Sequence, residues 1–509
     1  MVECTPPCML SCGTATSFVL SNEGVLWVTG LNHHLQLGLP NIRLANNSPP
    51  LSREYFEMLD FKDVPAFRMV CSTASTTFAI AVDQTLFSWG NNKDGQLGQG
   101  DADDLGLPAR VFLFYSEVTN DLCRLPKIRQ VTCGHSHTLI LAEDGQVLAC
   151  GDNSYGQLGR RDVDISMPCN RFVEIYPLHA QKTTLLKSVR SIASGGSVSA
   201  MILWDHTLWM WGSHINLQVP PLYTEDGLEC RNIPTMIEDF VDDADETNNS
   251  DHERRPFLVK SISIADEHCA CITVDKRVWT WGMNIHGKLG NGTKQASTCR
   301  PTSMMSAAQL VLMSPPVDIC CGGFHTLIQS TVGSLWVAGA CKLGIGIDGG
   351  HSAGLCRFQK VILPPCARAD GGGDMRVLAI SAGRTHSAIV TSCGHVMTCG
   401  KMKAAVAITP RAVQPGAGSG YCGFGGLGYF QGLAQQGHVN TFQKVYQLRS
   451  KVSFMARFSP CTLAKVQAML VGAHFDKEIL ATTTKDRIFM NLLPSELLDA
   501  IIRHMLISR

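Results

Sequence analysis

Four histidines recur at one position of a repeated sequence pattern and are the first candidates for acid–base chemistry. They are His137, His268, His325 and His386. Imidazole exchanges protons near neutral pH, so a histidine beside a nucleophile can act as a general base. These four are equivalent to one another, however, and no serine or cysteine nucleophile with a distinctive partner accompanies them. We therefore expect a shared packing and hydrogen-bonding role and no catalytic residue.

Two glycine-rich stretches match nucleotide-binding motifs in part. Residues 282–289 (GMNIHGKL) match a phosphate-binding loop until Leu289 stands where Ser or Thr would hold magnesium, and Lys288 is replaced by glutamine in sister repeats. Residues 418–423 fit a dinucleotide fingerprint, but no βαβ unit surrounds them. Repeat symmetry explains the first match and a flexible insert the second. We expect no cofactor and no metal site.

The balanced charge predicts a chain without a clustered basic surface. Lys plus Arg equals Asp plus Glu at 43 each, in 509 residues. Nucleic acids and anionic membranes attract clustered positive charge, so we expect no direct nucleic-acid partner. No apolar run is long enough to span a membrane, and the start, MVECTPPCMLSCG, lacks a secretion signal. We expect an intracellular monomer in the cytoplasm, with the nucleus also open, whose 21 cysteines are mostly reduced thiols.

Internal repetition is the strongest signal in the chain. Seven windows of 22 residues, beginning at 9, 69, 130, 191, 261, 318 and 379, align without a gap. Each ends in a glycine: Gly30, Gly90, Gly151, Gly212, Gly282, Gly339 and Gly400. Apolar segments with a period of two flank a turn in each window, which is typical of a β-hairpin. All eight tryptophans lie in these windows, so the windows are expected to form the core.

A glycine turn follows several windows, and the segment lengths predict the fold. Gly95-Gln96-Leu97-Gly98 recurs at 156–159, as Gly-Lys-Leu-Gly at 287–290 and, less cleanly, at 35–38, each behind an asparagine that can cap the turn. Four short strands in each of seven units of about 60 residues predict an all-β, seven-bladed β-propeller of four-stranded blades. A solenoid could use the same units, but it would need caps at two apolar ends.

The windows resemble the regulator of chromosome condensation family. The resemblance rests on the Cys-Gly-x-x-His-Thr segments at 133–138 and 321–326, the Asp-Gly hairpin turn and the Trp-Gly-x-Asn-x-x-Gly-Gln-Leu-Gly string, and it covers about residues 9–450. It implies a seven-bladed propeller and, from the founding members, guanine-nucleotide exchange on a Ran-like small GTPase. Repeats two and five depart from the pattern with Thr73 and Ala265 at the first glycine, and repeat four lacks the glycine turn.

We expect residues 1–464 to form the propeller, interrupted by two insertions that could carry function. The first, 218–260, contains EDFVDDADETNNSDHERR, which is either a solvated loop or an acidic docking segment for a basic partner. The second, 401–437, is Gly-rich and is either a mobile loop or an aromatic contact surface. The candidate partner-binding residues are Asp242, Asp243, Asp245, Glu246, Asp251, Tyr421, Phe424 and Tyr429.

The tail, 465–509, is expected to hold a degenerate half-repeat and a short C-terminal helix. Residues 470–490 loosely repeat the window pattern and could supply a strand that closes the ring or could pack outside it. Residues 492–506 (LLPSELLDAIIRHML) are amphipathic and resemble the first helix of an F-box. A helix docked on the propeller is the alternative interpretation.

Three functions are consistent with these patterns. The favoured one is a non-enzymatic protein-protein interaction scaffold, because no chemical motif survives comparison between repeats. The second is guanine-nucleotide exchange on a Ran-like small GTPase, in which a propeller face weakens the nucleotide contacts by differential binding. The third is substrate recruitment to a ubiquitin ligase through the F-box-like tail. Light sensing through clustered tryptophans is not favoured, because the tryptophans lie inside the hairpins.

Overall fold

The structure is a computed structural model, and it describes a ring of β-sheets. The described residues are 9–39, 52–59, 61, 64–116, 118–160, 168–175, 189–213, 215, 219, 233–238, 257–294, 297–303, 314–340, 354–363, 375–392, 394–401 and 438–444. The chain divides into two compact units, Thr5–Gln447 and a second made of Met1–Cys4 with Leu448–Arg509. The tail predicted at 465–509, including its helix, lies outside the described residues.

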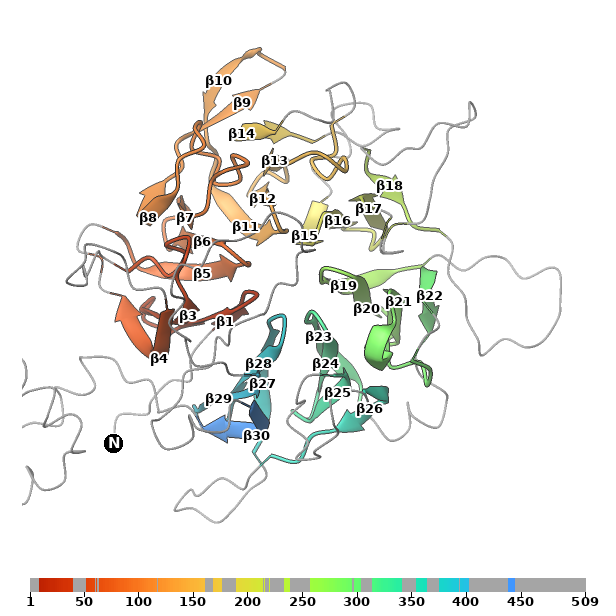
Figure 1. The fold of residues 1–509 in the computed structure, drawn as a ribbon. Coiled ribbons are helices and arrows are strands. Elements are labelled where there is room, and N and C mark those ends of the chain that lie inside the picture. The colour runs from red at the N-terminus through yellow and green to blue at the C-terminus, as the bar shows by residue number, and fades with distance from the viewer. Residues whose placement is uncertain are drawn as a thin grey trace, which may run out of the picture. The chain divides into compact units, whose positions relative to one another are not determined.

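Seven antiparallel sheets stand around one axis, as Figure 1 shows, and each is a blade whose strands run in chain order from the centre outward. Blades one to three contain β1 (Met9–Cys12), β2 (Thr16–Leu20), β3 (Leu26–Leu31), β4 (Ser52–Leu59); β5 (Phe67–Ser72), β6 (Thr76–Ala81), β7 (Leu86–Gly90), β8 (Leu105–Arg110); and β11 (Ile128–Cys133), β12 (His137–Ala142), β13 (Val147–Gly151), β14 (Cys169–Glu174). Blades four and five contain β15 (Val189–Gly195), β16 (Val198–Leu203), β17 (Leu208–Gly212), β18 (Thr235–Met236); and β19 (Val259–Ile264), β20 (His268–Thr273), β21 (Val278–Gly282), β22 (Thr298–Ser303). Blades six and seven contain β23 (Pro316–Cys321), β24 (His325–Ser330), β25 (Leu335–Gly339), β26 (Leu355–Lys360); and β27 (Val377–Ala382), β28 (His386–Thr391), β29 (Val396–Lys401), β30 (His438–Lys444). The seven-bladed, all-β prediction is confirmed, and the one helical element among the described residues is the 3-10 turn η2 (Ile285–Gly287).

The second strand of each blade is buried along its whole length. In blade three, every residue of β12 is buried, and Leu139 and Ile140 face opposite sides of the sheet. Leu139 packs into the core shared with blade four, while Ile140 packs into the core shared with blade two. Alternating apolar residues thus cover both flanks of each blade, and the stacked flanks supply the hydrophobic stabilisation of the ring.

The glycine that ends each window is required by a close backbone approach. Gly151 adopts a φ of 106°, and a Cβ atom there would lie 2.3 Å from the carbonyl oxygen of Ser136. The equivalent glycine in the other six blades also has a positive φ and a similarly close carbonyl. An L side chain would clash with the backbone and strain it at once, which explains why glycine recurs.

The asparagine predicted to cap the glycine turn does so. In blade three the Asn153 Oδ1 accepts a hydrogen bond of 3.0 Å from the amide of Leu158, which is fully buried. Asn32, Asn92 and Asn284 make the same bond at 2.9–3.0 Å. Blade one keeps this geometry although Leu35, with a φ of 62°, replaces the first glycine.

Among the described strands, blade seven meets blade one without an added strand. Blade one is completed by its own four consecutive strands, from β1 to β4. The amide of Cys12 donates to the Ser381 hydroxyl at 2.9 Å, and His386 Nε2 lies 3.0 Å from the Ser17 hydroxyl. These contacts close the ring within the described residues.

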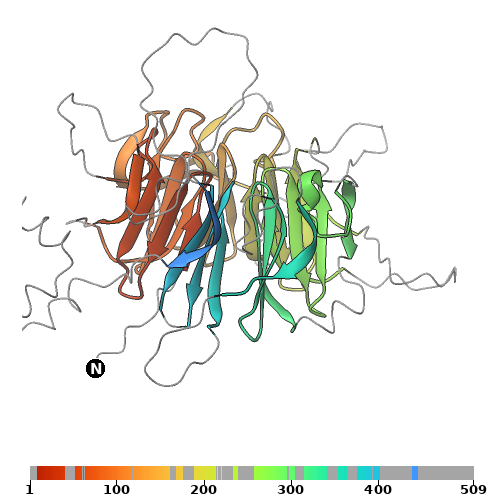
Figure 2. The ribbon, with the colours of Figure 1, turned by 60° about the horizontal axis from the view of Figure 1, so that its bottom comes forward.

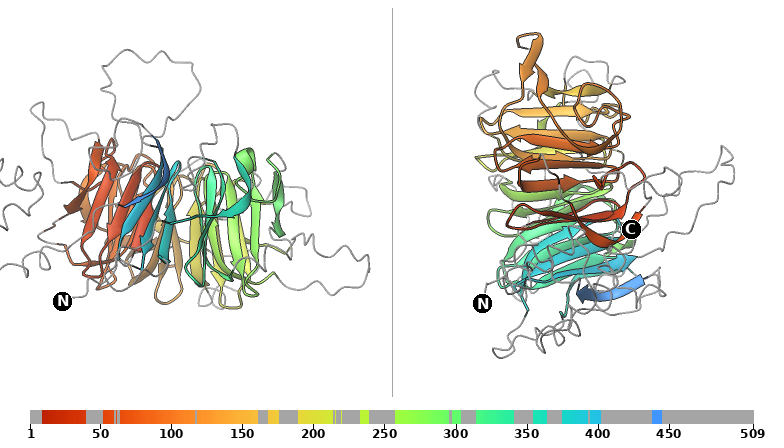
Figure 3. Two further views of the ribbon diagram at one scale, coloured as in Figure 1. Left: turned by 90° about the horizontal axis from the view of Figure 1, so that it is seen from below. Right: turned by 90° about the vertical axis from the view of Figure 1, so that its left-hand side faces the viewer.

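Blade three is wider than predicted because a hairpin precedes it. Strands β9 (Leu113–Ser116) and β10 (Asp121–Arg124) pair with each other, and β9 also pairs in parallel with β14. The sheet therefore has six strands, and the hairpin projects from the outer rim of the ring (Figures 1 and 3).

Candidate functional site

The two faces of the ring differ in the connections that they carry. In each blade the first and third strands run toward one face, where the connection from the first to the second strand lies. We call this the mouth face. Figure 2 shows the blades standing side by side in the ring. The Asp-Gly hairpin turns, such as that at 143–146, lie at the opposite face, because antiparallel strands reverse direction at each turn.

The two predicted insertions begin at opposite faces. Lys401 pairs with His438 at the mouth face, so 402–437 leaves and rejoins the ring there. Strand β18 runs away from the mouth face and β19 starts at the opposite face, so the acidic stretch joins the ring opposite the mouth. The range 218–260 also contains β18 and the first residues of β19. The eight candidate residues in the two insertions lie outside the described residues.

A central cavity of about 210 Å³ opens at the mouth face. Its wall consists of the inner strand ends and first turns of all seven blades, among them Gly13, Thr73, Gly134, Gly322 and Gly383. Because these residues are small, the surface of the cavity lies close to the backbone. Because seven equivalent turns converge here, any residue that differs between repeats is presented at one shared opening.

Charged side chains break the repeat at this opening. Counting from the first residue of each window, position six holds Thr14, Ala74, Gly196 or Gly323 in four blades, but His135, Asp266 and Arg384 in blades three, five and seven. We call His135, Asp266, Arg384 and the neighbouring Phe324 the mouth cluster. Its members come from four different blades, so only the closed ring assembles it.

His135 and Asp266 form an ion pair across the mouth. His135 Nδ1 lies 3.7 Å from Asp266 Oδ1, and both side chains are partly exposed. The hydrogen bond with Asp266 raises the pKa of His135, against the effect of burial. Burial alone would raise the pKa of Asp266, but His135, with Arg384 and Lys288, holds it below its ordinary value. Each partner thus favours the charged form of the other.

Arg384 is held by an aromatic ring and keeps its hydrogen-bond donors available. Its guanidinium carbon lies 5.8 Å from the centre of the Phe324 ring, which also meets His286 edge-on at 6.0 Å. Arg384 makes no hydrogen bond or ion pair with any other described residue. A guanidinium stacked on an aromatic ring is pre-positioned for a carboxylate or a carbonyl oxygen.

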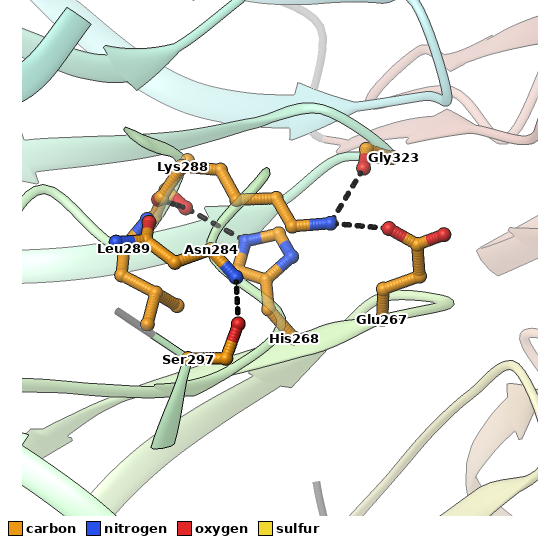
Figure 4. A network of polar contacts seen from close by, with 8 residues as sticks. Glu267, His268, Asn284, Lys288, Leu289, Ser297 and Gly323 are labelled. Atoms are coloured by element: carbon orange, nitrogen blue, oxygen red, sulfur yellow. Dashed lines mark hydrogen bonds and ion pairs between the residues drawn. The ribbon is translucent and has the colours of Figure 1, made fainter. Parts of the chain in front are cut away.

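Lys288, the lysine of the phosphate-loop-like segment, is sequestered beneath the cluster. Figure 4 shows its ammonium between Glu267 and Gly323: Nζ donates to Glu267 Oε2 at 2.6 Å and lies 3.4 Å from the Gly323 carbonyl oxygen. The Lys288 side chain is fully buried, whereas Glu267 is partly exposed. The lysine therefore links blades five and six, and its buried ammonium group is not accessible to a phosphate.

The four repeat histidines are buried between blades. Nε2 of His137 lies 2.9 Å from the Ser199 hydroxyl of the next blade, and that hydroxyl donates to the Gln157 carbonyl oxygen at 2.7 Å. Ser199 must therefore accept a hydrogen bond from His137 Nε2. His268, His325 and His386 bridge in the same way to Thr326, Ser387 and Ser17 at 2.7–3.0 Å. None of the four is exposed to a substrate.

Burial keeps these histidines neutral. It lowers the pKa of His137 and of His386 to about 4 and that of His325 to about 3, and it lowers the pKa of His268 strongly. Metal-binding groups are also lacking in the part of the chain that the structure describes: no three His, Cys, Asp or Glu side chains gather there in a suitable cluster. No helix in that part is long and apolar enough to cross a bilayer.

The mouth cluster was not found from the sequence. Function was expected in the insertions, whereas the cluster occupies a window position without any insertion. The signal present in the sequence was a difference between repeats: His135, Asp266 and Arg384 align with the small residues Thr, Ala and Gly in the other four repeats. What the sequence could not show is that position six faces a shared opening.

Sequence profiles identify the repeat unit. The profile described as the regulator of chromosome condensation (RCC1) repeat matches residues 83–141, 144–202 and 275–329, and a second profile of the same repeat matches 128–157. Among curated relatives, the ultraviolet-B receptor UVR8 of Arabidopsis thaliana is 26% identical over 278 residues, which cover 54% of each chain. The probable E3 ubiquitin-protein ligase HERC6 of Homo sapiens is 29% identical over 260 residues, covering 49% of this chain and 21% of the relative. The match thus spans about half of the first relative and about a fifth of the second.

Solved structures show the same fold. Human WBSCR16 superposes with a TM-score of 0.56 at 18% identity, covering 77% of this chain and 88% of that one. Prp20p from Saccharomyces cerevisiae superposes with a TM-score of 0.56 at 17% identity, covering 75% and 81%. Identities this low support the shared fold alone.

Proposed function

From the premise that this chain carries regulator of chromosome condensation repeats arranged as a seven-bladed propeller, we propose that it is a non-enzymatic protein-interaction module whose mouth face binds a protein partner. One observation carries the proposal: side chains that can form ion pairs converge from several blades on the mouth, where the other repeats carry small side chains. A partner loop with both an acidic and a basic group would complement Arg384 and Asp266.

The repeat comparison supports binding over catalysis. The buried histidines and Lys288 are occupied in links between blades, and the described mouth offers no nucleophile paired with a base. The insertion 402–437 also joins the ring at this face, so Tyr421, Phe424 and Tyr429 belong to the same proposal. The acidic residues Asp242, Asp243, Asp245, Glu246 and Asp251 form a second proposed contact, and their segment joins the opposite face.

Quantitative affinity purification tests the choice of face. The full chain carrying Asp266→Ala with Arg384→Ala should lose partners that the unaltered chain retains. A matched control carries Asp205→Ala with Lys127→Ala, two exposed residues of opposite charge on the other face, and it should retain them. Chains lacking 238–255 or 402–437 report on the insertions. Equal recovery with the mouth variant and the control would refute the proposal.

Exchange on a small GTPase is a second candidate, favoured by a structural neighbour. Prp20p is described together with its binding properties to Gsp1p and histones, and a propeller face can release a nucleotide by binding the empty GTPase more tightly. Stopped-flow release of a fluorescent guanine nucleotide from a Ran-type GTPase tests it. Faster release with excess propeller would support exchange, and an unchanged rate would remove it. Deleting the rim hairpin 113–124 would then separate a rim contact from a mouth contact.

Recruitment to a ubiquitin ligase through the tail stays a proposal with weaker support. HERC6 is named as a probable ligase, but the match covers only 21% of it. Retention of a ligase adaptor by the full chain, and its loss when 465–509 are deleted, would support recruitment.

A further inference from the structure

The inner strands of neighbouring blades are linked around the cavity by one recurring contact. The amide at window position four donates to the side chain at position three of the preceding blade. Examples are Ser72 N to the Ser11 hydroxyl at 2.9 Å and Ser194 N to the Thr132 hydroxyl at 3.1 Å. The same link joins the Cys321 amide to Ser263, the Ala382 amide to the Cys320 sulfur and the Cys12 amide to Ser381, at 2.9–3.2 Å.

This contact also brings the two side chains together. Between blades three and four, the Thr132 and Ser194 hydroxyl oxygens lie 3.0 Å apart. Cys321 and Ser263 also touch through their side chains, as do Cys12 and Ser381. Positions three and four of adjacent blades are therefore juxtaposed by the fold itself, whichever residues occupy them.

Between blades two and three, both positions hold cysteine. Strands β5 and β11 contact each other, and the side chains of Cys71 on β5 and Cys133 on β11 lie near enough to interact. Both residues line the cavity, and Cys71 is partly exposed. No other pair of these positions joins two cysteines: the partners of Cys12 and Cys321 are serines, and Cys320 faces Ala382.

We propose that Cys71 and Cys133 are a redox modification site, at which a peroxide oxidises the two thiols to a disulfide that links blades two and three. This goes beyond partner binding and does not depend on it. Neighbouring inner strands in direct side-chain contact can bring two Cβ atoms within the short range that a disulfide requires. In an otherwise reducing compartment, such a bond serves as a reversible signal.

The two thiols have different roles in this oxidation. The hydrogen bond from Cys133 lowers the pKa of Cys71, whereas burial raises the pKa of Cys133 well above its ordinary value. Cys71 therefore ionises more readily than Cys133, and its thiolate attacks the peroxide O–O bond, which gives a sulfenic acid and releases hydroxide, protonated to water. The Cys133 sulfur then displaces the sulfenic oxygen, which leaves with the thiol proton as a second water. Two thiols lose two protons and two electrons in all, and one hydrogen peroxide becomes two waters.

Peptide mapping under non-reducing conditions tests the proposal on the full chain. Graded hydrogen peroxide should produce a cross-linked peptide joining Cys71 to Cys133, with the loss of two hydrogens, and dithiothreitol should reverse it. Cys71→Ser and Cys133→Ser should each abolish this peptide. Serine already occupies the equivalent positions in other blades, so both variants should fold.

Cys320→Ser is the matched control, because Cys320 occupies the position of Cys71 at a junction without a second thiol. It should leave the cross-link unchanged. The oxidised chain should also melt at a higher temperature than the reduced chain, and the shift should vanish in Cys71→Ser. Peroxide that yields only sulfinic acid at Cys71, or cross-links other cysteines instead, would overturn the proposal.

Discussion

Two neighbouring junctions of the ring, between blades three and four and between blades four and five, are built by different means. At the first, the Thr132 and Ser194 hydroxyls meet, and His137 reaches Ser199. The indole of Trp211 also donates to the Gln157 carbonyl oxygen at 2.9 Å. This junction therefore has several polar links from the cavity outward, in addition to the apolar core that the two blades share.

The second junction replaces those residues with apolar ones. Ala193 stands where Thr132 does, Val198 stands where His137 does, and blade four lacks the Gly-Gln-Leu-Gly turn. Blade four also ends in a strand of two residues. Its flank instead packs Val198 and Met210 into one apolar cluster with Ile264 and Trp281 of blade five.

The polar residues of the repeat are thus one of two ways in which the ring stabilises the same junction geometry. A buried hydrogen bond adds only about 0.5–1.5 kcal/mol net, so several of them equal the burial of one large side chain. The propeller therefore tolerates a blade without them, provided that the flank is apolar. It also follows that mutations should affect the two junctions differently.

The largest effect is expected at the apolar junction. Trp281 is fully buried, and Trp281→Ala should lower the free energy of unfolding by about 3–5 kcal/mol through lost burial and a cavity. Chemical denaturation monitored by circular dichroism measures it. Trp281→Phe, which keeps an aromatic ring, should cost much less. A loss for Trp281→Ala below that for Ser199→Ala, described below, would contradict the apolar account of this junction.

Acid should weaken the histidine-linked junctions and leave the apolar one unaffected. In the unfolded chain these histidines titrate near pH 6.5, but burial lowers the pKa of His137 and His386 to about 4 and that of His325 to about 3. Between those values the unfolded chain binds more protons. The free energy of unfolding should therefore decrease as the pH is lowered, by about 1.4 kcal/mol per pH unit for each histidine.

Denaturation curves recorded from neutral pH down to about pH 5 measure this slope. His325→Gln should reduce the slope by the contribution of one histidine. Above pH 6.5 these histidines should contribute no slope. A slope unchanged by the substitution would show that His325 is not buried in its neutral form.

Removing one polar link should have a smaller effect. Ser199→Ala deletes the hydroxyl between His137 and Gln157 and leaves His137 Nε2 without its partner, while the Gln157 carbonyl oxygen keeps its bond from Trp211; the cost should be about 1–3 kcal/mol. Ala200→Gly, also fully buried on β16, controls for general sensitivity of this strand. A double-mutant cycle with His137→Ala should show coupling between the two sites, and strict additivity would argue against the link.

The smallest effect should be a gain. Ala193→Ser places a hydroxyl where Thr132 has one in blade three, opposite the amide of Ile264. It should stabilise the ring by roughly 0.5–1 kcal/mol by adding the missing link. Thermal melts of Ala193→Ser and of a Ser194→Ala comparison measure the two directions. Destabilisation by the added serine would mean that the two inner strands do not approach closely here.

The sequence predicted the ring because backbone geometry forces glycine to recur. Gly151 and its equivalents cannot carry a Cβ, so their spacing marks every blade. The cap made by Asn153 was predictable for the same local reason. Blade four was found through its window alone, since Gly212 persists although the turn residues are lost.

The rim hairpin and the mouth cluster depend on contacts distant in sequence. Strand β9 is fixed by its pairing with β14, about 60 residues later, and Asn120 makes the hairpin turn with a φ of 56° instead of a glycine. His135 and Asp266 meet only because the ring brings blades three and five to one opening. Local patterns contain neither relationship.

Hydrogen exchange of the propeller with and without a captured partner tests the central claim most directly. If partners bind at the mouth face, protection should appear in the first turns of several blades, including 134–136, 265–267, 322–324 and 383–385. The hairpin turns of the opposite face, such as 143–146 and 204–207, should exchange as in the free chain. Protection confined to those turns, or to the outer rim, would contradict the account.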